Sequence, residues 1–148
     1  MAGRAARGRD AQAVRLPRHP RVWLAGLLAW LGLLWWLSSR QGLPGPDLFP
    51  HFDKVAHFTY FAGGAFLFGG WQARKPGFSR ISGRLMLLTI VFISVVGIID
   101  EWHQLHTPGR SGGDVWDWLA DTLGAICGVF VLKSVHPQPR RDSRSLAE

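Results

Sequence analysis

The sequence predicts an all-α fold: an integral membrane bundle of four transmembrane helices with both termini in the cytoplasm. Three observations predict it. The apolar residues gather in four long blocks, the basic residues fall almost entirely on one side of the membrane that these blocks would cross, and most tryptophans lie near block ends. Because the chain has only 148 residues, four such blocks leave little sequence for a second domain.

The four apolar blocks are 18 or 19 residues long, enough for a helix to cross about 30 Å of hydrocarbon. They span residues 22–39, 55–73, 85–103 and 115–132. The first block follows an arginine-rich start, as the apolar core of a secretory signal peptide would. Because it is longer than a usual signal core and no A-x-A-like cleavage site follows it, we interpret it as a span.

The basic residues predict the orientation. Of the 17 Lys and Arg, 14 lie before the first block, between the second and third, or after the fourth. Only Arg40, Lys54 and Arg110 fall on the other side. Cytoplasmic segments of membrane proteins are enriched in Lys and Arg, so this distribution predicts a multi-pass protein of the inner membrane with both termini in the cytoplasm.

The tryptophans support the same topology, since seven of the eight lie near a predicted membrane boundary. Residues 1–20 and 134–148 are expected to be basic cytoplasmic tails, which leaves 21–133 as the membrane domain. The tails do not interleave aromatic residues with their arginines. We therefore expect no nucleic-acid partner, and the net charge of +7 serves orientation.

Polar residues concentrate at the predicted outer ends of the second, third and fourth spans. Helical spacing places them in stripes, with His57 and Asp117 about one turn below the predicted outer boundary and Asp121 about one turn deeper. A carboxylate facing lipid at that depth would cost up to roughly 2.5 to 3.5 kcal/mol, so the stripes should point into the bundle or a wet cavity. Intramembrane ionisable residues are functional candidates. The candidate binding residues are Asp53, Lys54, His57, Glu101, Gln104, Arg110, Asp114 and Asp117.

Acids outnumber bases in this region. The six carboxylates are Asp53, Asp100, Glu101, Asp114, Asp117 and Asp121. Only Lys54 and Arg110 oppose them, so either some carboxyl groups hold protons at neutral pH or a cation lies among them. A purely structural network is the alternative, in which Asp53 pairs with Lys54 and Arg110 pairs with Asp114 or Asp117.

Such a cluster could be a metal site, the active site of a hydrolase or a binding site for a polar group. A metal site could draw on His57, Glu101, His103, His106 or Asp117, but the sequence DEWHQLH is not the HExxH motif, and His103 and His106 are expected on a loop. We therefore predict no metal and no cofactor.

A hydrolase could use Glu101 or Asp117 as a base with His57, and Arg110 as an electrostatic clamp. No serine or cysteine nucleophile is suitably placed, so no catalytic residue is assigned. A binding site for a polar group needs only the cluster itself.

At these residues the sequence resembles the VanZ-like family. The resemblance rests on D-K-x-x-H-x-x-Y-F from Asp53, on E-x-x-Q from Glu101, and on P-G-R from Pro108, leading into D-x-x-D from Asp114 and then Gly124. It implies a compact helical membrane protein with these motifs at the extracytoplasmic face. The family takes its name from glycopeptide-resistance clusters, where members are associated with tolerance to teicoplanin. The family pattern often has Asn where this chain has Asp121.

The leading hypothesis is an outer polar pocket that binds a cell-envelope or antibiotic-related group, with the lipid bilayer and an envelope or lipid-linked ligand as partners. A membrane hydrolase or transferase acting on a lipid-linked substrate at the outer leaflet is the first alternative. A structural scaffold is the second. Transport is not favoured, because the cytoplasmic halves of the four spans lack ionisable residues.

Overall fold

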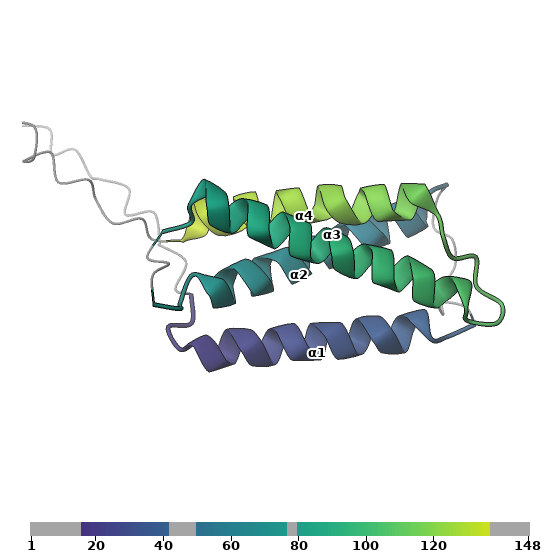
Figure 1. Cartoon of the computed structure of the whole chain (residues 1–148), viewed down its shortest axis with the longest axis horizontal. Helices are drawn as coiled ribbons and strands as arrows, with labels where there is room; N and C mark the ends of the chain where they lie inside the picture. Colours follow the sequence, from purple (N-terminus) through teal and green to yellow (C-terminus); the bar gives the residue numbers. More distant parts are fainter. Residues whose placement is uncertain (1–15, 42–49, 77–79, 137–148) are drawn as a thin grey trace, which may run out of the picture.

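The computed structural model describes residues 16–41, 50–76 and 80–136, and this part of the chain is all-helical, as predicted. The helices are α1 (Pro20–Ser38), α2 (Phe52–Gln72), α3 (Gly83–Leu105) and α4 (Val115–Val135). All four run roughly along the long axis of the molecule (Figure 1). Most of both predicted tails, residues 1–15 and 137–148, lies outside the described residues.

Three of the helices, α1, α3 and α4, are long and apolar enough to cross a membrane. The second predicted span corresponds to α2, which is less apolar and is not among these three. Its 21 residues extend roughly 31 Å, and it contacts each of the other three helices. A helix covered by its neighbours needs less apolar surface than one facing lipid, so packing explains its weaker hydropathy.

The helices α2 and α4 pack closely because two glycines of α4 lie against the backbone of α2. A Cβ atom added at Gly124 would lie 2.2 Å from the carbonyl oxygen of Phe58, and one added at Gly128 would lie 2.1 Å from that of Ala62. Any larger residue would force the helices apart. The small-residue spacing therefore serves close helix packing, the role expected of such positions in a membrane.

Helix α1 joins α2 through reciprocal hydrogen bonds near mid-helix. The indole Nε1 of Trp30 donates to the carbonyl oxygen of Tyr60 at 3.1 Å, and the hydroxyl of Tyr60 donates to the carbonyl oxygen of Trp30 at 2.7 Å. The Trp30 ring lies against Gly64, where an added Cβ would come within 2.4 Å of it. The tryptophan that lies away from the predicted boundaries thus has a packing role.

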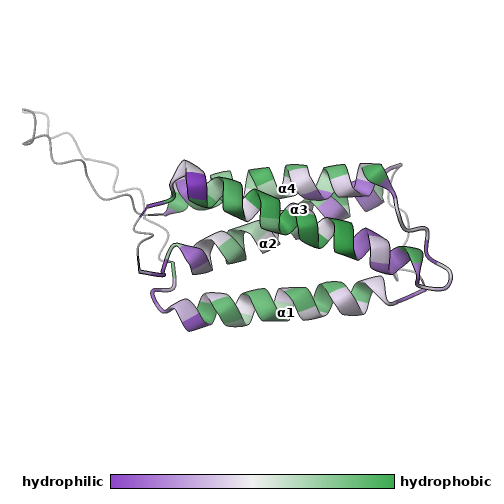
Figure 2. Cartoon of the chain, in the orientation of Figure 1, coloured by the Kyte–Doolittle hydropathy of each residue, from purple (hydrophilic) through white to green (hydrophobic). Residues whose placement is uncertain are grey.

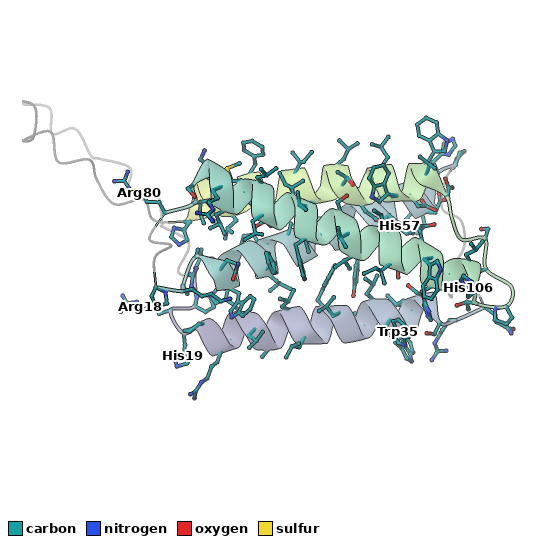
Figure 3. The ribbon with its side chains drawn as sticks, in the orientation of Figure 1. Arg18, His19, Trp35, His57, Arg80 and His106 are labelled. Atoms are coloured by element: carbon teal, nitrogen blue, oxygen red, sulfur yellow. The ribbon has the colours of Figure 1, made fainter. Side chains whose placement is uncertain are left out.

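The two ends of the bundle differ in charge. One end carries the starts of α1 and α3 and the ends of α2 and α4, and Figure 3 shows Arg18, His19 and Arg80 there. We call it the basic end, because seven of the ten Lys and Arg in the described residues lie at it. Figure 2 shows an apolar middle with polar residues toward both ends. The opposite end, with His57, Trp35 and His106, we call the acidic end (Figure 3).

Candidate functional site

The acidic end brings the three predicted polar segments together. All eight predicted site residues lie here, on the start of α2, the end of α3, the loop that follows it and the start of α4. The predicted inward orientation is confirmed for Glu101, Asp117 and Asp121, which are 5%, 8% and 0% exposed. It is wrong for Asp53, whose side chain is 55% exposed. The residues form two groups, which differ in the partners of their carboxylates.

The first group, the Lys54 cluster, surrounds a single ammonium with three carboxylates. The Nζ atom of Lys54 lies 2.8 Å from Asp53 Oδ2, 2.6 Å from Asp114 Oδ2 and 2.7 Å from Asp117 Oδ1. The contact with Asp117 is an ion pair without hydrogen-bond geometry. The cluster therefore ties the start of α2 to the start of α4.

Asp114 also caps α4. Its carboxylate accepts a hydrogen bond from the backbone N–H of Trp116 at 2.8 Å, as expected of an N-cap aspartate. The hydrogen bond from Lys54, and then the one from Trp116, holds the pKa of Asp114 below its ordinary value of 3.8. Asp114 is thus ionised and serves both a helix end and an ion pair.

The second group, the inner group, contains His57, Asp100, Glu101 and Asp121. The Nδ1 atom of His57 lies 2.9 Å from Asp121 Oδ1, which joins α2 to the deepest acid of α4. Gly97 of α3 makes room for that acid, because a Cβ there would lie 2.7 Å from Asp121 Oδ2. The sequence suggested a deep inward position for Asp121 but gave no sign of its histidine partner.

Asp100 links three elements. It accepts hydrogen bonds from the hydroxyl of Ser38 on α1 and, at 2.7 Å, from Gln104 Nε2. The Oε1 atom of Gln104 in turn accepts a hydrogen bond from Arg110 at 2.5 Å. Of the two ion pairs in the structural alternative, that of Asp53 with Lys54 is present, and that of Arg110 with Asp114 or Asp117 is wrong. The loop after α3 turns the guanidinium of Arg110 toward the side-chain amide of Gln104, and Lys54 pairs with both of those acids instead.

Two residues of this chain of hydrogen bonds were missing from the predicted site. Asp100 was counted among the acids but not among the candidate binding residues, although it is adjacent in sequence to the candidate Glu101. Ser38 gave no signal, because a serine at a helix end is common and its partner lies 62 residues away.

Glu101 has one partnered and one unpartnered oxygen. Its Oε2 accepts a hydrogen bond from the backbone N–H of Asp114 at 2.9 Å. Within the described ranges, Oε1 is buried and has no hydrogen-bonding partner. His57, Asp100 and Glu101 each offer one potential metal-ligating atom, and these three atoms lie within 4.8 Å of one another.

Of the two histidines expected on a loop, His106 lies there, at the first position after α3, and His103 does not. His103 lies in the last turn of α3, so its loop assignment was wrong, because the helix extends to Leu105. Its ring stacks on Trp35 at 3.9 Å between centroids and bonds Ser39. His106 caps the helix and bonds the carbonyl oxygen of Trp102. Neither contributes to the group of three potential ligands.

A cavity of about 90 Å³ opens beside the inner group. Its polar lining includes Ser38, His57, Asp100, Gln104 and Arg110. Its apolar lining comes from α1 and α2 and includes Leu34, Leu37, Ala56 and Phe61. Three of the predicted residues, His57, Gln104 and Arg110, line the cavity. Four others form the Lys54 cluster, and Glu101 belongs to the inner group.

The fold and the site define a multi-pass α-helical membrane protein with a network of buried ionisable residues at one end of the bundle. The model of the VanZ/LLP1 family matches residues 8–136, and the chain belongs to this family. The resemblance inferred from the motifs is thereby confirmed. Neither the curated proteins nor the solved structures gave a match.

Proposed function

We propose that this VanZ-family protein uses the cavity at its acidic end to bind the polar, anion-bearing head group of a lipid or lipid-linked cell-envelope molecule. The observation that carries the proposal is the mixed lining of the cavity. Arg110 and His57 face the same space as Leu34, Leu37 and Phe61. Polar groups that fix orientation among apolar walls are typical of small-molecule sites, and this pattern suits a charged head group with an acyl chain.

The proposed topology places the cavity at the outer leaflet. In it, α2 is a fourth span, both termini are cytoplasmic, and the basic end faces the cytoplasm of a cell bounded by an inner membrane. The excess of Lys and Arg at the basic end supports this orientation. Two of these cations lie over tryptophan rings, Arg74 over Trp23 and Lys75 over Trp71, as expected near a membrane interface.

Arg110 is the anion-binding residue in this proposal. A guanidinium has five N–H donors, and within the described part of the chain only Gln104 receives a side-chain hydrogen bond from Arg110. The remaining donors can bind a phosphate or carboxylate in a bidentate arrangement. The bond to Gln104, which Asp100 holds in turn, positions the guanidinium at the cavity. A role in glycopeptide tolerance, which the family name suggests, would follow if the bound group belongs to a cell-wall precursor.

The test compares lipids that co-purify with the wild type and with Arg110→Gln, measured by native mass spectrometry in detergent. Arg40→Gln is the matched control, because Arg40 lies at the same end but stacks on Trp36 and does not line the cavity. We expect at least a tenfold loss of an anionic lipid or lipid-linked species in Arg110→Gln alone. Equal occupancy in all three proteins would refute the binding site.

A second candidate, a hydrolase or transferase on the same class of molecule, is favoured by one observation. His57 lines the cavity, and Asp121 orients its ring through Nδ1. A histidine held by a carboxylate can take a proton from water or a hydroxyl through Nε2. This candidate predicts turnover of a lipid-linked phosphate substrate by the purified protein and its loss in His57→Gln with head-group binding retained. Binding without any turnover would contradict this second candidate and agree with the first proposal.

A further inference from the structure

We propose that His57, Asp100 and Glu101 form a binding site for a divalent transition-metal ion, with Zn²⁺ or Mn²⁺ as the fitting class. The three side chains come from α2 and α3, and their potential ligand atoms lie within 4.8 Å of one another. One imidazole and two carboxylates are a donor set that suits these ions. The site stands on this geometry and does not depend on the head-group proposal.

The unpartnered oxygen of Glu101 is the second, independent observation. Glu101 is 5% exposed, and its Oε1 is buried with no hydrogen-bonding partner among residues 16–41, 50–76 and 80–136. Leaving a buried acceptor unpaired costs about 1 to 3 kcal/mol, and more for a charged group. A metal ion would satisfy Oε1, while Oε2 keeps its bond to the backbone N–H of Asp114.

The contact of His57 with Asp121 leaves Nε2 as the nitrogen available to a metal ion. With Asp121 accepting from Nδ1 at 2.9 Å, the proton resides on Nδ1 and the lone pair on Nε2. A carboxylate behind the imidazole is the usual outer partner of a ligating histidine, because it fixes the tautomer and the direction of the ring. Asp121 is a positioning residue in this arrangement and not a ligand.

Charge balance favours a cation in the inner group. Asp100 is 5% exposed, Glu101 5% and Asp121 0%. Lys54 is already paired with three other acids, and Arg110 bonds an amide, so within the described part of the chain no Lys or Arg pairs with these carboxylates. Three ionised acids beside His57 would be strongly unfavourable at low dielectric, and a divalent ion would offset two of the charges.

The coordination requires only a modest closure of the three side chains. A tetrahedral ion with ligand bonds of about 2.0 to 2.2 Å holds its ligand atoms roughly 3.4 Å apart, so two atoms at the 4.8 Å limit must approach each other by about 1.4 Å. His57 and Asp100 also line the cavity, which leaves an open position there for water or for an anionic oxygen of a ligand. A metal on Nε2 removes the lone pair that the hydrolase candidate needs, so the two roles for His57 exclude each other.

The test measures metal content and affinity on the full chain purified in detergent. Elemental analysis after purification without chelator is expected to find close to one Zn or Mn per chain. After treatment with EDTA, titration with Zn²⁺, with Mn²⁺ and with Mg²⁺ as the comparison should give one tight site for a transition ion and weak binding of Mg²⁺. Glu101→Gln should weaken that binding at least 100-fold, because it removes a charged ligand of nearly the same shape.

Two further variants control the interpretation. Asp121→Asn retains an acceptor for His57 Nδ1, so it should weaken binding about 10-fold, less than loss of a ligand. Asp53→Asn changes a carboxylate at the same end that lies outside the site, and should leave the affinity unchanged. Wild-type protein that elutes as one species, carries no metal and binds neither Zn²⁺ nor Mn²⁺ would overturn the proposal. Equal weakening by Asp53→Asn and Glu101→Gln would do the same, by indicating nonspecific charge attraction.

Discussion

The Lys54 cluster and the inner group are both rich in carboxylates, yet they balance charge differently. In the Lys54 cluster, three carboxylates share one ammonium, and two of them, Asp53 and Asp114, are partly open to solvent. In the inner group, the carboxylates are almost fully buried, and their partners are one histidine, a serine, a side-chain amide and a backbone N–H. From this difference we expect the Lys54 cluster to fasten α2 to α4, and the inner group to hold more carboxyl groups than helix packing requires.

The largest expected effect comes from removing the shared ammonium. Lys54→Met leaves three neighbouring carboxylates without a cation, and we expect a loss of about 3 kcal/mol in the free energy of unfolding. Unfolding by SDS in mixed micelles measures it. Lys54→Arg retains the charge and should recover most of the loss. A loss below about 1 kcal/mol would mean that solvent screens the cluster, and that it does not fasten α2 to α4.

The next effect concerns the hydrogen bond that joins α1 to the inner group. Ser38→Ala removes a buried donor from the carboxylate of Asp100, which should cost about 2 kcal/mol in the same assay. Ser39→Ala is the matched control, because the hydroxyl of Ser39 bonds the carbonyl oxygen of Trp35 and the ring of His103 at exposed positions, and the change should cost less than about 0.5 kcal/mol. Equal costs would show that Asp100 does not depend on α1.

The sequence predicted the helices and the meeting of the polar segments, but not which residues pair within them. Apolar block lengths predicted the helices to within a few residues, and the location of three polar segments at the same predicted end of the bundle predicted that they meet. The partners could not be predicted, because they depend on rotation and depth. Arg110 lies four to seven residues before the expected acids, yet it turns back to Gln104. The weak hydropathy of α2 likewise reflects its neighbours.

Removing a buried acid from the inner group should stabilise the fold, whereas the substitutions of Lys54 and Ser38 should destabilise it. In metal-free protein, Glu101→Gln removes a buried carboxyl group that has no Lys or Arg partner among the described residues, and the amide oxygen can still accept from the backbone N–H of Asp114. We expect the free energy of unfolding to rise by about 1 kcal/mol, as buried charges replaced by neutral groups of similar shape can stabilise a fold. A loss larger than about 2 kcal/mol would show that the inner group is structural, like the Lys54 cluster.

The smallest effect is the acid sensitivity of the Lys54 cluster. The pKa of Asp114 is held below 3.8 in the folded protein, chiefly by Lys54, so its contribution is fully present above the unfolded value. It is lost as the pH falls through the lower, folded value. Comparing wild type with Asp114→Asn from pH 6 to pH 3, the stability difference should be constant down to about pH 4.5 and then narrow. Because Asp114 is partly exposed, salt should reduce the difference. A difference that widened on acidification would contradict the ion pair with Lys54, since only a folded pKa above the unfolded one gives that sign.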